Sequence, residues 1–345
     1  MKLDAKLTHL PIWGGSGIPG NTGASKSDVM HIDKTLTMED VFFKYPGIWD
    51  KSTDKLGDLR GNDFMVWEQE IRDGYAEETY SDVPQLVCYP VQGSDRAMII
   101  CPGGAYLSKS MESEGDEVAR FLNAAGISAF VLWYRTYPYR APLMFLDAQR
   151  AVRFVRHHAG EYGIDPGKIG ICGFSAGGNL AGVEAFCFRN EPVSFPGYTP
   201  DEVDAEDGTP NAVGLIYPAI HLQGDKIVAV MAGREVYEDP AKRDAFADKY
   251  DMRLNVRTGD APVFLCAALD DPVVPPLHVL ELTRKCREAG VSCETHLFAF
   301  GDHGFGACEP HPPVGPFPQP DFSLTRQWRG LYTTWLNSVF DGKIL

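Results

Sequence analysis

A short segment at 169–181 constrains the fold of this chain more than any other part of the sequence. An apolar run typical of a strand comes first, Ser175 follows between Gly173 and Gly177, and small residues that start a helix come next. This G-x-S-x-G pattern predicts a strand-to-helix turn so sharp that larger side chains two positions from the serine would collide. Such a turn exposes the serine oxygen at the C-terminal edge of a sheet and directs the following backbone N–H toward a developing oxyanion. We therefore interpret residues 173–177 as a nucleophile elbow with Ser175 as the nucleophile; an ordinary loop rich in glycine and serine is the alternative.

The charge of the chain excludes several classes of partner. Its 345 residues include 32 Lys and Arg against 47 Asp and Glu, which gives a formal net charge of −15 at pH 7. Nucleic acids and anionic membranes bind basic faces, so we expect neither as a partner. A neutral or cationic small molecule is favoured as the substrate. With 44% hydrophobic residues, a chain of this length can form one large α/β domain with insertions.

The eight cysteines form neither a disulfide framework nor a zinc pattern. No Cys-x-x-Cys pair occurs, and most cysteines lie inside apolar stretches. We therefore expect reduced, buried thiols and no metal site, as is typical of a reducing compartment. The first residues are charged where a signal peptide would be apolar, and no long apolar run occurs. The sequence thus predicts a cytoplasmic location and no membrane span.

The N-terminal region is the least regular part of the sequence. A formal G-x-G-x-x-G lies between residues 15 and 20, but no strand precedes it and Pro19 occupies the helix start, so we interpret it as a loop. Aromatic residues recur through this region, which favours ordered structure over a disordered tail. We expect an N-terminal extension at 1–80 that packs on a main catalytic domain at 81–345.

Strand and helix patterns alternate over the rest of the chain. Period-two alternation predicts antiparallel strands at 63–71 and 85–91, and a continuous apolar run at 97–101 is typical of a central strand buried on both faces. Further strands and helices are expected in turn at 117–125, 128–134, 142–158, 169–174, 212–217, 263–268, 277–289, 292–299 and 323–339. This order predicts right-handed crossovers and a mostly parallel sheet with helices on both faces. A charged helical insertion is expected near 222–258.

Several short motifs lie where these predicted elements end. They are PGGAY at 102–106, LWYR at 132–135, LDAQRA at 146–151, GFSAGG at 173–178, YP at 217–218, DPVVP at 271–275 and GDHGF at 301–305. With these motifs, residues 84–340 resemble the α/β-hydrolase superfamily, and within it the acetylxylan-esterase and feruloyl-esterase-like carboxylesterases. The resemblance implies the α/β-hydrolase fold and a Ser-His-Asp triad.

The general base and its partner acid can also be argued from the residues. A serine nucleophile needs a base, and a histidine held in one tautomer by a carboxylate is the usual one. Of the nine histidines, His303 alone lies in a glycine-flanked loop directly after a predicted strand and C-terminal to the elbow. Asp270 and Asp271 both follow the strand at 263–268, and the family spacing Asp-x-x-Val-Pro favours Asp271. The resulting order, Ser175 then Asp271 then His303, is that of α/β-hydrolases.

The predicted oxyanion hole combines the backbone N–H of Ala176 with one from the loop after the strand at 97–101. Bare backbone must approach the substrate there, which explains the glycines at 103 and 104; a plain tight turn is the alternative. Related esterases commonly have a third glycine where this chain has Ala105. Because alanine disfavours a left-handed backbone, we expect Gly104 to be the first donor of this loop and Ala105 the second.

Three residues that follow strand ends are expected to rim the substrate site, namely Tyr106, Arg135 and Tyr137. The alternative is that Arg135 pairs with a carboxylate and that the tyrosines pack inside the domain.

These features predict a serine hydrolase that cleaves carboxylic esters with short acyl groups through an acyl-enzyme, with no cofactor. Acetylated sugars or xylo-oligosaccharides are the expected small-molecule substrates. Another hydrolase on the same scaffold, such as a formamidase or an acyl-peptide hydrolase, is one alternative, and a non-catalytic ligand-binding relative is another. The sequence is also compatible with a homo-oligomer.

Overall fold

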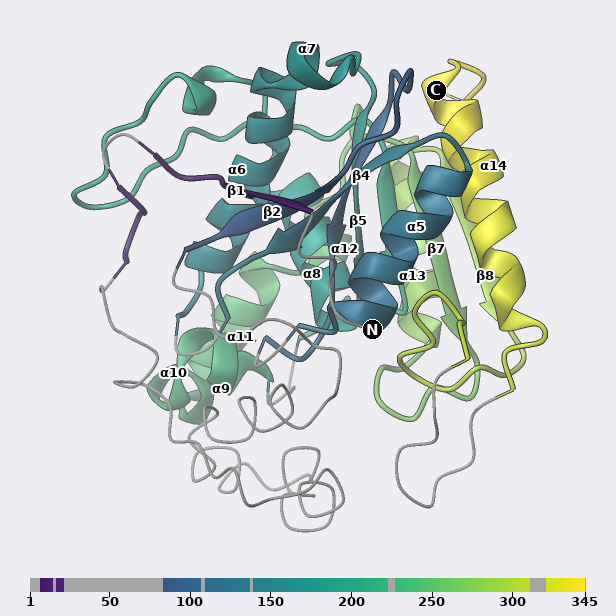
Figure 1. Cartoon of the computed structure of the whole chain (residues 1–345). Helices are drawn as coiled ribbons and strands as arrows, with labels where there is room; N and C mark the ends of the chain where they lie inside the picture. The colour runs from purple at the N-terminus through teal and green to yellow at the C-terminus, as the bar shows by residue number, and fades with distance from the viewer. Residues whose placement is uncertain are drawn as a thin grey trace, which may run out of the picture.

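The computed structural model describes residues 7–14, 17–21, 83–106, 109–136, 139–222, 227–310 and 321–344. These residues form an eight-stranded sheet (Figure 1). In chain order, the strands are β1 (Thr8–Pro11), β2 (Gln85–Tyr89), β3 (Ala97–Cys101), β4 (Ser128–Trp133), β5 (Ile169–Phe174), β6 (Val213–Ile216), β7 (Val263–Ala268) and β8 (Cys293–Phe298). β2 runs antiparallel to its neighbours β1 and β4, and all other neighbouring pairs are parallel. The prediction of a mostly parallel sheet is confirmed.

Helices cover both faces of this sheet. They include α5 (Glu117–Ala124), α6 (Leu143–His157), α8 (Ser175–Val183), α13 (Leu277–Ala289) and α14 (Trp328–Phe340). α5 and α14 lie in front of the sheet in Figure 1, with the rings of Phe121 and Trp328 in edge-on contact at 5.2 Å between centroids. α6, α8 and α13 lie behind it. The arrangement is the α/β-hydrolase fold that the sequence motifs implied.

The strand order sets where the loops meet. Across the sheet the order is β1-β2-β4-β3-β5-β6-β7-β8. From β3 the chain crosses to β4 on one side and later returns to β5 on the other side, so the winding direction reverses at β3. The loops that follow the two neighbouring strands at such a switch point, here β3 and β5, open side by side at the carboxyl edge of the sheet. Cys101, at the end of β3, is in register with Gly173 of β5. The predicted oxyanion loop therefore lies beside the predicted elbow.

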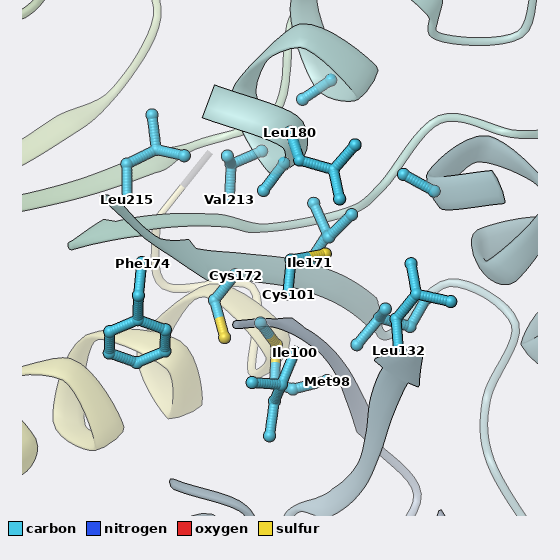
Figure 2. Packing of buried hydrophobic residues seen from close by; sticks show 14 of the residues in the cluster. Met98, Ile100, Cys101, Leu132, Ile171, Cys172, Phe174, Leu180, Val213 and Leu215 are labelled. Carbon is cyan, nitrogen blue, oxygen red and sulfur yellow. The ribbon is translucent and has the colours of Figure 1, made fainter. Parts of the chain in front are cut away.

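The core lies on both sides of the central strands, because their sequences are continuously apolar. Figure 2 shows Leu180 of α8 and Leu215 of β6 on one side of β5, while Cys172 and Phe174 point to the other side. There Phe174 packs against Trp328 of α14, with ring centroids 5.8 Å apart. β5 therefore packs against helices on both of its faces, and this packing fixes the position of its C-terminal end.

The N-terminal region contributes a strand that the sequence pattern did not predict. β1 has only four residues, too few for alternation to identify it, and it pairs with the edge of β2. Just after it, the indole N–H of Trp13 donates to Asp147 of α6 at 2.8 Å. The predicted strand at 63–71 and most of the extension at 1–80 lie outside the described residues.

Further helical segments complete the fold. They are η2 (Glu112–Asp116), α7 (Ala159–Tyr162), η3 (Glu184–Phe188), η4 (Val203–Ala205), α9 (Ile227–Ala232), α10 (Arg234–Glu238), α11 (Pro240–Lys249), α12 (Met252–Asn255) and η5 (Thr325–Gln327). α9 to α12 lie between β6 and β7, where the charged helical insertion was expected. η2 is a π-helical turn that runs directly into α5. The sequence pattern predicted a helix only from residue 117, so η2 is a new element.

Two further properties of the described residues concern membranes and metals. No helix there is both long enough and apolar enough to cross a membrane. No group of three or more His, Cys, Asp or Glu side chains there is arranged to hold a metal ion. All eight cysteines are free thiols, and most of them are buried.

Candidate active site

Ser175 sits at the tip of a sharp turn between β5 and α8. Its φ of 51° lies in the left-handed region, which is uncommon for a residue other than glycine and marks a strained turn. The two glycines of the motif are required by space. A Cβ on Gly173 would lie 2.0 Å from the carbonyl oxygen of Gly177, and a Cβ on Gly177 would lie 2.0 Å from that of Cys101. The turn therefore has the geometry that the sequence motif predicts for a nucleophile elbow.

A histidine and an aspartate complete a hydrogen-bonded chain with this serine. His303 Nε2 lies 2.9 Å from Ser175 Oγ, and His303 Nδ1 lies 2.7 Å from Asp271 Oδ2. The Asp271 side chain is fully buried, whereas His303 and Ser175 are partly exposed. The three residues follow β8, β7 and β5, so the parallel sheet brings together loops that are far apart in sequence. In this arrangement His303 can take the serine proton while Asp271 fixes its tautomer.

The two adjacent aspartates point in different directions. Asp271 Oδ1 accepts hydrogen bonds from the backbone N–H groups of Val273 at 2.8 Å and Val274 at 2.9 Å, which leaves Oδ2 for His303. Asp270 instead accepts from the backbone N–H of Asp302 at 3.0 Å. Asp270 therefore holds the backbone of the histidine loop but does not touch the imidazole ring.

The loop after β3 differs in one respect from the expectation. Gly104 has a φ of 134°, and Ala105 and Tyr106 both have left-handed φ values, 53° and 57°. The expectation that Ala105 avoids this region is wrong. A left-handed alanine costs roughly 1–2 kcal/mol, and side-chain and backbone contacts of the loop offset it. The Tyr134 hydroxyl donates to the Pro102 carbonyl at 2.6 Å.

This loop lies directly against the nucleophile. A Cβ on Gly103 would lie 2.6 Å from the Phe174 carbonyl oxygen and 2.9 Å from Ser175 Cβ, so only glycine fits. On the other side of the serine, Ala176 is at the start of α8, where the first backbone N–H groups have no partner inside the helix. The N–H of Ala176 and the loop at 103–105 thus flank Ser175 where an oxyanion would form.

Glu114 of η2 belongs to the site, although the sequence reasoning missed it. Its Oε2 accepts the backbone N–H of Gly103 at 2.5 Å, and its Oε1 accepts the hydroxyl of Tyr217 at 2.8 Å. The local sequence gave no signal for it, because Glu114 is one of several acidic residues within 112–117. Glu114 and Asp116 are both buried, and only the tertiary structure shows that Glu114 is the one that contacts the site loops.

Two of the three expected rim residues do not line the site. Arg135 is completely buried and forms a bidentate ion pair with Asp147, with nitrogen to oxygen distances of 2.7 and 2.9 Å. It also donates to the carbonyl of Pro19, so the N-terminal segment covers this strand end. Tyr106 is likewise fully buried, and its hydroxyl donates to Asn179 at 2.7 Å. Their expected role as rim residues is therefore wrong, and the structural alternative holds for both.

The third expected rim residue, Tyr137, lies outside the described residues.

Comparison with known proteins agrees with this geometry. The sequence model of the BD-FAE family matches residues 89–286, more than half of the chain. The acetylxylan esterase of Xylanibacter ruminicola is 31% identical over 228 residues, which cover 64% of this chain and 44% of that protein. Endo-1,4-beta-xylanase B of Butyrivibrio fibrisolvens is 29% identical over 251 residues, or 69% of this chain and 37% of that protein. The chain thus spans less than half the length of these curated relatives.

Solved structures give the same result for the fold. An acetyl ester-xyloside bifunctional hydrolase from Caldicellulosiruptor lactoaceticus has a TM-score of 0.65 and 31% identity, covering 76% of this chain and 90% of that one. A thermophilic esterase from Thermogutta terrifontis with butyrate bound has a TM-score of 0.59 at 22% identity, covering 74% and 90%, and shares the fold. The region matched by the family model contains the elbow, the loop after β3 and the loop after β7 that carries Asp271. The chain therefore belongs to the BD-FAE family of α/β-hydrolases.

Proposed function

We propose that this chain is a serine carboxylesterase that removes short acyl groups, with acetylated sugars or xylo-oligosaccharides as its substrate class. The observation that carries the proposal is the hydrogen-bonded chain from Ser175 through His303 to Asp271 at the carboxyl edge of the sheet. The names of the relatives, an acetylxylan esterase and an acetyl ester-xyloside hydrolase, support the acetyl and sugar parts of the proposal.

In the proposed reaction, His303 Nε2 takes the proton of Ser175 as its oxygen attacks the ester carbonyl carbon. The carbonyl oxygen becomes an oxyanion that is stabilised by the N–H of Ala176 and by backbone N–H groups of the loop after β3. The protonated His303, stabilised by the buried Asp271 carboxylate, then donates its proton to the departing alcohol. An acyl group remains on Ser175, and water removes it by the same route in reverse, with His303 again acting as the base.

The nucleophile is tested by Ser175→Ala with an acetyl ester as substrate. We expect kcat to fall to the residual ~10³–10⁴-fold enhancement over water that binding and the oxyanion hole alone provide. Circular dichroism should show that the variant is folded. Incubation of the wild type with a slowly hydrolysed ester, followed by mass spectrometry, should place the acyl group on Ser175. A variant that keeps more than a few per cent of wild-type kcat would contradict the assignment.

The substrate class is tested separately, with acetyl, butyryl, octanoyl and feruloyl esters and with acetylated xylo-oligosaccharides. We expect kcat/KM to be highest for acetyl esters and to fall with acyl length. A preference for feruloyl or octanoyl esters would overturn the substrate class and leave the serine mechanism standing.

A further inference from the structure

Glu114 connects two loops of the proposed active site from a third element, η2. Its side chain is almost completely buried, and each carboxylate oxygen accepts a hydrogen bond from a different loop. One bond comes from Gly103 in the loop after β3. The other comes from the hydroxyl of Tyr217, which directly follows β6.

Tyr217 extends this connection to the histidine loop. Its oxygen accepts the backbone N–H of Gly306, three residues after His303, at 2.9 Å. Its ring also lies edge-on to the His303 imidazole, with centroids 5.0 Å apart. The path from Gly103 through Glu114 and Tyr217 to Gly306 therefore joins the predicted oxyanion loop to the loop that carries the general base.

The backbone of η2 contacts the histidine loop as well. The Ser113 carbonyl accepts the backbone N–H of Ala307 at 2.9 Å, and a Cβ on Gly306 would lie 2.5 Å from the Ser113 carbonyl oxygen. η2 thus contacts the His303 loop through its backbone, and it contacts the loop after β3 and Tyr217 through the Glu114 side chain.

The chemistry of the pair favours a charged carboxylate at this position. An ionised carboxylate only accepts hydrogen bonds, which matches the two donors that Glu114 faces. Burial and the neighbouring Glu114 raise the pKa of Tyr217 well above its ordinary value, so the phenol keeps its proton and acts as a donor. Burying a carboxylate is costly unless its hydrogen bonds are made, and here both of its oxygens have a donor.

We propose that Glu114 is a positioning residue of the esterase, which fixes the oxyanion loop against Ser175 and, through Tyr217, holds the His303 loop in register with it. This inference rests on the proposed function. It also assigns the backbone N–H of Gly103 to Glu114, so the oxyanion donors of this loop come from residues beyond Gly103.

The first test is Glu114→Gln, which keeps the shape but replaces one acceptor oxygen by an NH₂ donor. The amide has one acceptor oxygen and cannot accept from both Gly103 and Tyr217, so the link between the loop after β3 and the His303 loop should be weakened. Losing one oxyanion donor lowers kcat by about 10²–10³-fold, and displacing the loop should lower it by about 10–100-fold. We expect KM to change less than about threefold, because the effect is on the transition state. Tyr217→Phe, which leaves the bond between Glu114 and Gly103 in place, should give a smaller fall in kcat.

The matched control is Asp116→Asn in the same π-helical turn. Asp116 is as buried as Glu114 and also accepts from a tyrosine hydroxyl, that of Tyr89 at 2.9 Å, and from Arg120 at 2.8 Å. Its partners belong to β2 and α5 rather than to the site loops. Asp116→Asn should lower the melting temperature while leaving kcat within about twofold of wild type.

Affinity for a transition-state analogue distinguishes a positioning role from a purely structural one, because a purely structural role would leave that affinity unchanged. Ser175 adds to the carbonyl carbon of a methyl trifluoromethyl ketone and forms a tetrahedral oxyanion. The Ki of this inhibitor should therefore rise in Glu114→Gln in parallel with the fall in kcat/KM. Titration with a fluorophosphonate counts the competent serines in each variant, so that loss of folded protein is not mistaken for a slower reaction. Equal kcat and Ki in Glu114→Gln and wild type would overturn the inference, as would an equal kcat loss in Asp116→Asn. If the wild type itself neither hydrolyses esters nor reacts with the fluorophosphonate, the proposed function fails first, and the inference fails with it.

Discussion

At the residue scale, Asp270 and Asp271 illustrate how one turn separates two neighbouring side chains. Asp271 holds the imidazole of His303, and Asp270 holds the backbone of the loop that carries it. An asparagine at 271 can offer an NH₂ group to Nδ1 and so favour the wrong tautomer. We therefore expect Asp271→Asn to lower kcat by as much as ~10⁴-fold.

Asp270→Asn is the control for this prediction. It keeps an oxygen that can accept from Asp302, so kcat should fall by less than about tenfold. The kcat of each variant is measured by steady-state kinetics with an acetyl ester, and circular dichroism checks that both variants are folded. If Asp270→Asn proves the more damaging change, the carboxylate that matters for His303 is not the one in contact with it.

The predicted site residues that the structure brings into contact are those with a local pattern. Ser175 lies in a five-residue motif, and His303 and Asp271 lie in loops that directly follow predicted strands, so the parallel fold brings them together. Arg135 also follows a strand, but whether such a residue faces solvent depends on what covers that strand end. Here the segment that includes Pro19, more than a hundred residues away in sequence, covers it. No local pattern contains that information.

At the element scale, the backbone of the loop after β3 lies in contact with the elbow. Gly103→Ala should push the loop away from Ser175, since the added Cβ would collide with the Phe174 carbonyl and with Ser175 Cβ. We expect kcat to fall by about 10²-fold or more, the cost of losing an oxyanion donor. KM for a small ester should change little.

Gly160→Ala is the control for this steric argument. A Cβ on Gly160 of α7 meets no atom within 4 Å, and alanine suits a helix better than glycine. This variant should keep wild-type kcat and wild-type or slightly higher stability in urea. Wild-type kcat in Gly103→Ala would show that the loop can move without loss of function.

The elements themselves were predictable to different degrees. β3, β7 and α13 have the predicted bounds, because continuous apolar runs and a helical pattern ending at Gly290 define them locally. β1 and η2 were missed. β1 is too short to show alternation, and η2 is a π-helical turn whose residues resemble the acidic start of an ordinary helix.

At the scale of the whole molecule, the reversal of strand order at β3 explains why the site lies where it does. Loops after β3, β5, β6, β7 and β8 all open at one edge of the sheet, and hydrogen bonds between them then set distances that the sheet alone would leave free. The N-terminal segment adds stability on the other side of the switch point, where Trp13 and Arg135 both bind the buried Asp147. Mutations in that buried cluster should therefore act on folding, and mutations among the loops on kcat.

The stability of the whole fold should also depend on pH through Lys109, which is buried near the end of β4. Its ammonium donates to the Tyr134 carbonyl at 3.1 Å, and burial lowers its pKa to about 7. In the unfolded chain the pKa is about 10.4. Between these two values the unfolded state binds one more proton than the folded state, so the free energy of unfolding rises with pH by at most ~1.4 kcal/mol per unit. Lys109→Met removes the free-energy cost of neutralising the Lys109 ammonium on folding. The variant should therefore have a higher free energy of unfolding than wild type near pH 7, and this difference should shrink steadily toward pH 9. Urea unfolding at pH 7, 8 and 9 measures the difference; parallel pH dependences of the two proteins would mean that Lys109 is not neutralised on folding.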